Sequence, residues 1–590
     1  MKGFDVLKVK SAVKNHNKFD LSRSHLTTMN FGEIVPLLAE ETVPGDKFNI
    51  SGNYFSRMAP LAKPTYGKFQ FKTVAGFVPY HQVAYDADAW FAGKTVWEGQ
   101  TPTHRFITIE ALVTFIRTYC VVETGATATN CDFVWTGNTG TVHYCLFTTV
   151  GKYYVKVLNS LGYATPEGAD LRTTSTWWTD VRSIKLSAYP LLAFFKLYND
   201  YMSQSQRFNS SALSNFLQCV KYGKTVTGYT PSTGAIVADG INTMFSNLFL
   251  NYENDYFTSA WQEPNNALGV GESISSVPVP SAVPVGASVG QLNYDNVIVQ
   301  SGGTTLTLGQ RALDFLKDFD SWVRRNNYSG SRAVQQIYSR FGIKTDDYRS
   351  HYANVLATDS VSIQVGDVTA TASTLGTSPN NTTKLGDYAG KGIMNGNKAV
   401  SCQVSDYGII LILGYFTVTP MNSYGFDRKV LRSNPLDYYN PEFDGLGADA
   451  IPLMEYYENP RGVADSDSTL GNAVFGFTER YNSYRYGRDQ ITGEFRKYKT
   501  DDMNCWHTGR LLGAIRAAGN LVAQSSAVNT LPQTDSEYNR IFSVTSGDVD
   551  HFYLTAYFNV NAIRPMMNLN QVPRLGEGDT AVPRNGNVIS

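Results

Sequence analysis

The segment from Phe552 to Ala562 alternates apolar and polar residues with a strict period of two. Because successive side chains of a strand point to opposite faces, this alternation predicts a long strand with one face in a core and a polar opposite face. The segment from Lys68 to Val78 predicts another half-buried strand, because Phe69, Phe71, Ala75 and Phe77 fall on one face. Similar strands near both ends of the chain indicate one β-sandwich with very long connections.

The predicted fold class is therefore mainly β, a β-sandwich with long inter-strand loop insertions and a few short helices, and the arrangement weighed against the chain length is an eight-stranded jelly roll. Eight strands of average length use roughly 50 residues, so most of the 590 residues must lie in connections. Charged residues make up only 17% of the chain and aromatic residues 13%, which leaves much surface to bury. Bulky loops are expected where they contact neighbouring subunits or project from a surface, as in a shell-forming subunit.

Two insertions stand out between the terminal strands. Residues 97–180 are predicted to be β-rich, with a hairpin formed by Val142–Leu146 and Tyr153–Val157 around Gly151 and Lys152. Residues 264–308 contain no Lys or Arg and are rich in proline, which predicts a projecting loop or a disordered insert. A helical period is visible from Ala188 to Tyr201.

The first 25 residues carry six cations against two acids and show no sustained apolar period. This pattern predicts a mobile basic arm, so the chain is divided into an arm at 1–30 and a single jelly-roll domain at 31–590. Flexible cations can neutralise nucleic-acid phosphates without fixed geometry, although a merely solvated terminus has the same composition. The candidate nucleic-acid-binding residues are Lys2, Lys8, Lys10, Lys14, Lys18 and Arg23.

A stretch that mixes aromatic and basic residues lies near position 484. It could stack bases and bind phosphates, but Tyr and Arg are also enriched at the centres of protein interfaces. We favour a subunit interface formed by Arg480, Tyr481, Tyr484, Arg485, Tyr486 and Arg488.

Motifs of catalysis and metal binding are weak. Ser288 lies in a GxSxG string, but its proline-rich flanks cannot provide the strand and helix of a nucleophile elbow. The acidic pairs Asp86/Asp88 and Asp465/Asp467 fit a helix start and a solvated loop better than a carboxylate site. Zinc ligands could be drawn from His143 and nearby cysteines, but without paired spacing ordinary packing is favoured for Cys120, Cys131 and Cys145. No enzymatic activity or cofactor is predicted, and a divalent cation at subunit contacts stays open without assigned ligands.

Global properties exclude several other classes. The net charge of −1 excludes a strongly basic nucleic-acid protein at whole-chain level. The N-terminus lacks the apolar stretch of a signal peptide, so secretion is not expected. The longest apolar run, Ile409 to Phe416, is far shorter than the ~20 residues that span a bilayer, so no membrane insertion is expected.

Strings spread over nearly the whole chain resemble the major capsid protein of the Microviridae, single-stranded DNA bacteriophages, and are close to its gokushovirus-like branch. No one string is decisive, but several occur in the family's order. They are Ser24–Pro36, Gly45–Lys47, Phe55–Pro60, Leu186–Leu191, Tyr198–Tyr201, Asp255–Ser259, Leu385–Ile393, Phe475–Tyr481, Tyr484–Tyr486, Thr492–Arg496 and Ala562–Pro565. The region 97–180 contains no string of the family, so family surface features are not transferred to it.

This resemblance implies a viral jelly roll that self-assembles into a T=1 icosahedral shell of sixty copies around a circular single-stranded DNA genome. It implies contacts at five-, three- and twofold axes, and 264–308 is the candidate for a threefold surface protrusion. Implied partners are packaged DNA, internal scaffolding and DNA pilot proteins, and a host surface receptor. The expected locations are the virion and, during assembly, the bacterial cytoplasm. The alternative from another class is a β-rich secreted-type hydrolase or a carbohydrate-binding module.

Overall fold

The computed structural model describes most of the chain between residues 16 and 566. The described ranges are 16–96, 101–123, 126–127, 129–136, 141–164, 170–172, 181–203, 212–248, 250–253, 255–260, 296–301, 304–309, 321, 352–369, 388–422, 425–444, 448–456, 474–496, 503–510, 530–531 and 537–566.

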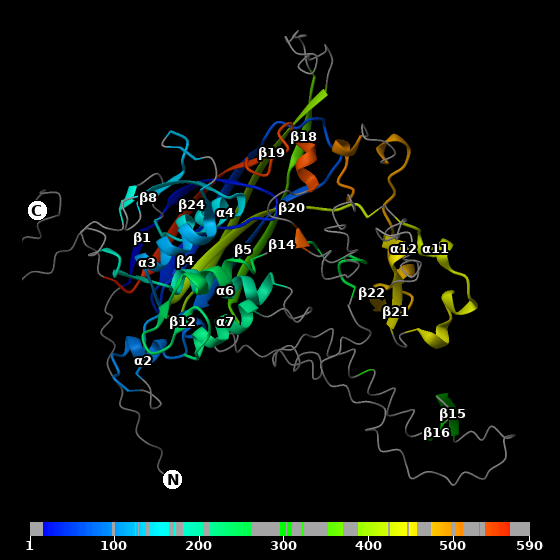
Figure 1. Ribbon diagram of the computed structural model, residues 1–590, viewed down its shortest axis with the longest axis horizontal. Helices are drawn as coiled ribbons and strands as arrows, with labels where there is room; N and C mark the ends of the chain where they lie inside the picture. The colour runs from blue at the N-terminus through cyan, green and yellow to red at the C-terminus, as the bar shows by residue number, and fades with distance from the viewer. Residues whose placement is uncertain are drawn as a thin grey trace, which may run out of the picture.

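Two antiparallel sheets form the centre of the molecule (Figure 1). The first sheet, sheet one, has the order β2 (Arg23–Met29), β24 (Phe552–Arg564), β4 (Lys47–Met58) and β19 (Tyr388–Gln403). It is extended by β1 (Asn17–Asp20), which also pairs with β24, and by β18 (Gln364–Thr369) beyond β19. The second sheet, sheet two, has the order β3 (Ile34–Thr42), β20 (Gly408–Val418), β5 (Phe69–Pro79) and β17 (Asn354–Ser362).

The pairing of these eight strands is nested along the chain. The first strand, β2, pairs with the last, β24; β3 pairs with β20; β4 pairs with β19; and β5 pairs with β17. This nested pairing is what results when one long hairpin is folded into a sandwich. Successive pairs along the hairpin then belong alternately to sheet one and sheet two. The predicted eight-stranded jelly roll is confirmed.

Aromatic side chains fill the space between the two sheets. The ring of Phe416 from sheet two stacks on Phe552 from sheet one with centroids 4.1 Å apart, and Phe71 lies 4.8 Å from Phe416. Tyr54 contacts both Phe71 and Phe558 at 5.6 and 5.8 Å. Every second residue of β24 from Phe552 to Ala562 is at most 1% exposed, so the predicted core face of this strand is confirmed.

Helices cover the other face of sheet two. The helix α6 (Tyr189–Tyr201) packs on β5 and β20, and an added Cβ at Gly76 would lie 2.5 Å from Leu197, so this glycine permits the close approach. The prediction that the Lys68–Val78 strand is half-buried was therefore wrong, because β5 is buried on both faces over most of its length. Sequence periodicity cannot report a helix that docks on a nominally outer face.

The connection from β5 to β17 contains most of the helices. Its helical elements are α1 (Tyr80–Val83), α2 (Ala87–Phe91), α3 (Ile109–Phe115), the π-helix η1 (Ile116–Cys120), α4 (Thr149–Ser160), α6, α7 (Ala212–Lys221) and α8 (Ala238–Phe245). Its strands are β6 (Phe106–Thr108), β7 (Val121–Val122), β8 (Phe133–Thr136), β9 (Val142–Phe147), β10 (Asp170–Arg172), β11 (Lys185–Ser187), β12 (Tyr229–Thr230), β13 (Ala235–Ile236), β14 (Leu250–Asn251), β15 (Asn296–Ser301) and β16 (Thr304–Gly309).

The predicted hairpin around Gly151 is wrong on its second arm, because residues 149–160 form the helix α4. Thr148 caps the helix by accepting a hydrogen bond from the Gly151 amide at 2.9 Å. The same apolar residues that alternate by two also recur at helical spacing, since Tyr153 and Val157 are four apart and both fully buried. The insertion 97–180 is thus mixed rather than β-rich. Within 264–308, the described part is the antiparallel pair of β15 with β16, and the remainder lies outside the described residues.

The prediction of a mobile arm was wrong for residues 17–29, which form β1 and β2 on the edge of sheet one. The sequence of β2 shows no alternation of apolar and polar residues, because its inward positions carry polar side chains. Arg23 donates to the Ala39 carbonyl at 2.6 Å, and His25 Nδ1 lies 3.0 Å from the Leu37 carbonyl, so both bond the edge of β3. Residues 1–15 lie outside the described residues.

A separate lobe is built from the connection between β20 and β24. It contains α11 (Arg428–Leu431), β21 (Ala448–Pro452), α12 (Leu453–Tyr456) and β22 (Val474–Glu479), and Figure 1 shows it beside the sandwich. This connection also includes the two-residue strand β23 (Thr530–Leu531), which pairs with β14. The lobe has its own small core, formed with a segment that follows β14: Tyr256, Phe257, Ala260, Ile451, Leu453, Tyr456 and Phe475.

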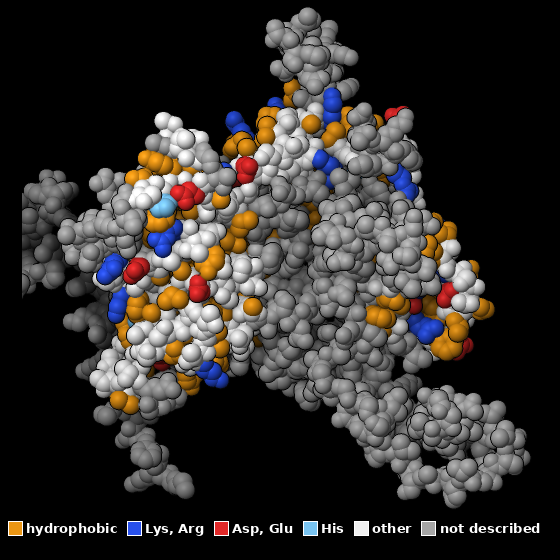
Figure 2. All heavy atoms as spheres, in the orientation of Figure 1, with side chains coloured by type: hydrophobic (Ala, Val, Ile, Leu, Met, Phe, Trp, Pro, Cys, Tyr) orange, Lys and Arg blue, Asp and Glu red, His pale blue; other side chains and the backbone are white. Residues whose placement is uncertain are grey.

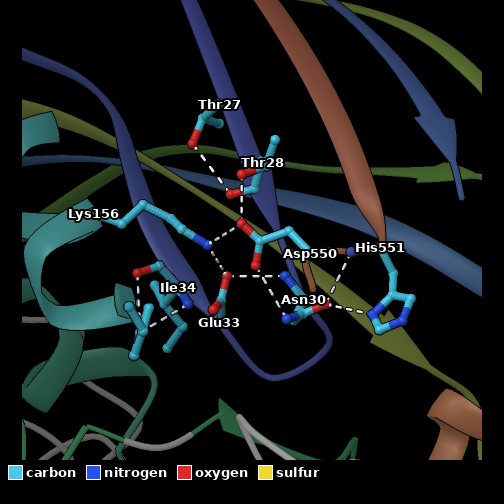
Figure 3. Close-up of polar contacts among 9 residues, drawn as sticks. Thr27, Thr28, Asn30, Glu33, Ile34, Lys156, Asp550 and His551 are labelled. Carbon is cyan, nitrogen blue, oxygen red and sulfur yellow. Dashed lines mark hydrogen bonds and ion pairs between the residues drawn. The ribbon is translucent and has the colours of Figure 1, made fainter. Parts of the chain in front are cut away.

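A buried polar cluster ties three distant parts of the chain together (Figure 3). Lys156 of α4 contacts Glu33 at 2.8 Å and Asp550 at 3.0 Å. Asn30 donates its backbone N–H to Glu33 at 2.9 Å and its side-chain amide to Asp550 at 3.1 Å. The Asn30 Oδ1 accepts from the backbone N–H of His551 at 3.0 Å. The turn between β2 and β3, the inserted helix and the entry to β24 are therefore held at one point.

Burial sets the protonation balance in this cluster. It raises the pKa of Glu33 to about 7, although Lys156 opposes the shift. The neighbouring carboxylates raise the pKa of Lys156 against its own burial. Burial lowers the pKa of His551, so this imidazole favours its neutral form. Glu33 and Asp550 thus share a single cation, Lys156.

Replacing Phe558 by Asp should prevent folding, whereas Thr555→Asp should be tolerated with a loss of about 1 kcal/mol or less. Phe558 is 0% exposed between the sheets, and Thr555 points outward from the same strand. Soluble yield and circular dichroism of the two variants provide the measurement. Equal tolerance would mean that the two faces of β24 are assigned the wrong way round.

The Glu33→Gln variant should alter the pH dependence of stability in a defined direction. A folded-state pKa raised from 4.5 to about 7 means that stability contributed by protonated Glu33 is lost as pH rises from about 4.5 through 7. Between pH 5 and pH 8 the native chain should lose about 2–3 kcal/mol more unfolding free energy than the variant. Denaturant midpoints at both pH values measure this difference, and parallel profiles would contradict it.

Candidate assembly interface

The predicted interface residues lie where β22 ends in the lobe. After Glu479 the chain turns through Tyr481, whose φ of 62° is the left-handed conformation that non-glycine residues rarely adopt. Tyr481 is only 3% exposed and packs against Tyr439 with ring centroids 5.2 Å apart. Burial of the tyrosine ring thus holds the turn that presents the residues after it.

Tyr484 and Arg485 form the exposed part of this stretch. Arg485 contacts Glu479 and Asp444, each at 3.1 Å, and its side chain stays 52% exposed. Arg432 lies over the Tyr484 ring at 3.8 Å, and Arg480 lies over the Phe443 ring at 5.1 Å. These cations already contact acids and aromatic rings of the lobe. Binding a phosphate would require them to give up those contacts.

Tyr486 and Arg488 instead point into the lobe. Tyr486 stacks on Tyr256 with centroids 4.9 Å apart, and Arg488 donates to the Gly425 carbonyl at 3.1 Å. The adjacent Glu455 is paired with Arg428 at 3.5 Å, and burial raises the pKa of Glu455 to about 7. The structure therefore divides the six predicted residues: Tyr481, Tyr486 and Arg488 support the lobe, while Arg480, Tyr484 and Arg485 lie toward its surface.

Sequence reasoning missed most of a larger group of exposed apolar side chains, of which it had predicted Tyr484 alone. This group, which we name the lobe patch, is partly visible in Figure 2 at the right of the molecule. Its members are each 41–64% exposed: Phe426, Val430, Leu436, Tyr438, Tyr439 and Tyr484. The sequence feature that could have predicted this group is the Tyr438-Tyr439 pair between Pro435 and Pro441. Aromatic residues on a short loop bounded by prolines are expected to stay at the surface, because such a loop has no core of its own. Clustered exposed apolar residues of this kind mark interaction surfaces.

Two of the predicted nucleic-acid-binding residues lie in described strands. Lys18 of β1 pairs in register with Ile563 of β24 at the edge of sheet one. Arg23 of β2 forms an ion pair with Glu40 at 3.1 Å, in addition to its bond to β3. The guanidinium of Arg23 is therefore occupied by contacts within the wall. Lys2, Lys8, Lys10 and Lys14 lie outside the described residues.

The motifs weighed for catalysis and metal binding have structural partners where they are described. Asp86 precedes α2, confirming the predicted helix start, and its carboxylate contacts the fully buried Arg105 at 2.9 Å. His143 stacks on Trp135 at 3.9 Å and contacts Glu123 at 2.8 Å. Cys120 and Cys145 are buried in the main core. Ser288, Asp465 and Asp467 lie outside the described residues.

Within the described ranges, no cluster of three or more His, Cys, Asp or Glu side chains is arranged to hold a metal ion. In the same ranges, none of the helices has the length and apolar character needed to cross a membrane.

Comparison with known proteins gives one consistent result. The capsid protein VP1 of Chlamydia phage 1 is 23% identical over 95% of this chain and 95% of its own length. The capsid protein VP1 of Bdellovibrio phage phiMH2K is 21% identical, also over 95% of both chains. The capsid protein VP1 of Spiroplasma virus 4 is 22% identical over 30% of this chain and 31% of its own length.

A family profile described as capsid protein (F protein) matches residues 7–106 and 162–574. The unmatched interval between these segments contains α3, β7 to β9 and α4, within the region where the sequence showed no string of the family. The matched segments contain all eight strands of the nested sandwich. From this match and the nested topology, the chain belongs to the phage capsid protein (F protein) family.

Proposed function

We propose that this capsid protein closes into a T=1 icosahedral shell of sixty copies around a circular single-stranded DNA genome. The carrying observation is the nested eight-strand sandwich within a chain that matches the capsid family over both of its terminal strands. A sandwich with the first and last strands paired gives each subunit a rigid wall. The long connections are then free to form contacts between copies, and repetition of those contacts closes the shell.

The lobe patch is our candidate for one of these contacts. Its tyrosines and aliphatic side chains are exposed in the single chain, and their burial against another copy would remove apolar surface from water. The ring-bound Arg432 and Arg480 supply cations whose side chains are already ordered, which lowers the entropic cost of association. These properties favour a protein interface over nucleic acid for Arg480, Tyr484 and Arg485.

Further partners are proposed from the family resemblance. They are the internal scaffolding and DNA pilot proteins and a host surface receptor, with assembly in the bacterial cytoplasm before release in the virion. We propose that 264–308 forms the threefold surface protrusion. The alternative hydrolase or carbohydrate-binding module finds no support in the family comparison.

Electron microscopy of the purified full chain tests the shell directly. Closed particles of uniform diameter or regular capsomers are expected. A monomer that forms neither, under conditions where its fold is intact, would refute the proposal.

Tyr438→Asp should fold normally but reduce the yield of particles by about tenfold or more, because a charge placed in a repeated apolar contact is penalised at each copy. Tyr438 is 53% exposed, so its replacement creates no cavity in the single chain. The matched control is Tyr222→Asp, at a tyrosine that is 50% exposed outside the lobe. Sucrose-gradient sedimentation measures the assembled fraction. Normal assembly by Tyr438→Asp would remove the lobe patch from the interface.

Replacing Lys2, Lys8, Lys10, Lys14 and Lys18 by Gln should leave the fold intact while lowering the ratio of DNA-filled to empty particles. Lysines neutralise phosphates by counterion release without fixed geometry, so the effect should not depend on DNA sequence. Arg23 is left unchanged because it bonds within the wall. Absorbance ratios of purified particles measure the packaged DNA. Protease cleavage at these lysines in intact filled particles would place the segment outside the shell.

A further inference from the structure

The two sheets of the sandwich differ in what covers their outer faces. Sheet two is covered by helices, whereas the outward residues of sheet one alternate as exposed positions along β24 and β4. We name the outward side of β24, β4 and β19 the open face. Its residues form rungs across the three strands, and from one end to the other these are Tyr553–Arg57–Ile393, Thr555–Phe55–Asn395, Tyr557–Asn53–Asn397, Asn559–Ser51–Ala399, Asn561–Asn49–Ser401 and Ile563–Lys47–Gln403.

The composition of the open face is unusual for a solvated sheet. Asn is depleted in strands, yet six asparagines share this one surface. Exposed sheet faces usually mix both signs of charge, but the outward residues of β24, β4 and β19 contain cations and no acid. The cations are Lys47, Arg57 and Lys391. Within the described part of the chain, no ion pair involves any of these three.

Aromatic rings lie beside Arg57 at one end of the open face, and Lys47 lies at the opposite end. Tyr553 and Tyr557 are each 47% exposed on β24, and Phe55 is 39% exposed on the neighbouring β4. The Arg57 guanidinium lies 5.4 Å from the centre of the Phe55 ring, and Arg57 is directly opposite Tyr553 in the strand register. Tyr553 and Tyr557 are four residues apart, about 13–14 Å along the strand. The three rings therefore form a zigzag that several successive unpaired bases could contact.

We propose that the open face binds single-stranded nucleic acid with little sequence preference. Tyr553, Tyr557 and Phe55 stack on bases, because every base has a π-face. Arg57 and Lys47 neutralise phosphates, and the asparagine amides donate to or accept from whichever base edge is presented. Our identification of this nucleic acid as the packaged genome rests on the proposed shell function. The inference adds a structured surface of the wall to the lysines near the N-terminus.

The charge of the open face favours single-stranded nucleic acid over a second copy of the chain as its binding partner. If two copies met through the open face across a twofold axis, its cations would meet a surface on which β24, β4 and β19 carry no acid and β1 adds Asp20 opposite Asn561, and buried unpaired cations are strongly unfavourable. Lys is also depleted at the cores of protein interfaces. A polyanion with exposed bases complements the cations, the amides and the rings together.

The experiment measures binding of the full chain to a fluorescent oligo-dT by anisotropy, with a duplex hairpin of equal length for comparison. Tyr553→Ser/Tyr557→Ser should weaken oligo-dT binding by about fivefold or more per tyrosine. Arg57→Gln/Lys47→Gln should reduce the slope of log affinity against log salt by about 1.4, or about 0.7 per cation. Matched controls are Tyr85→Ser/Tyr222→Ser and Lys94→Gln/Lys224→Gln, which replace exposed residues outside the open face.

All four double variants should retain the circular dichroism spectrum of the native chain, because the replaced side chains are not in the core between the sheets. Oligo-dT binding by the open-face variants equal to that of their controls would overturn the proposal. Loss of particle assembly with unchanged oligo-dT binding would also overturn it and would assign the open face to a contact between copies. Absence of particles from the native chain refutes the shell instead, so the two failures are distinguishable.

Discussion

The insertion of β24 between β2 and β4 is the constraint on which the rest of the structure depends. Strands more than 490 residues apart in the sequence must meet in register, from Met29 opposite Phe552 to Lys47 opposite Ile563. Once they do, Phe552 and Phe558 are enclosed between two sheets, and each connection must leave and return at a strand end. The long insertions therefore vary without changing the wall, which explains how a helical insertion absent from the family match fits between β5 and β17.

The cluster around Lys156 shows how an insertion is fastened to that wall. A single lysine from α4 contacts Glu33 beside β3 and Asp550 before β24, and Asn30 completes the hydrogen bonding of both carboxylates. Buried ion pairs give little net stability after desolvation, but they penalise alternative arrangements that would leave one charge unpaired. The cluster therefore specifies where α4 sits more than it strengthens the fold.

Sequence periodicity predicted the sandwich and both faces of β24, because a two-residue repeat has few other structural solutions. It failed where one apolar pattern suits two structures, as at Tyr153 and Val157, which fit either a strand or a helix. It also failed at β2, whose inward Arg23 and His25 bond the edge of β3 and so look like a solvated arm in the sequence. The sequence could not separate the internal Tyr486 from the exposed Tyr484 in the candidate interface, since that distinction depends on distant Tyr256.

The nested strand order also bears on the timing of synthesis. Because β24 lies between β2 and β4, a ribosome must synthesise more than 490 residues after β4 before the centre of sheet one can form. Until then the edges of β2 and β4 lack their shared partner, and contacts of such long sequence separation form slowly. A chain terminated early lacks the central strand and cannot build the wall. Chains truncated before β24 therefore cannot form the sandwich on which every contact between copies would be built.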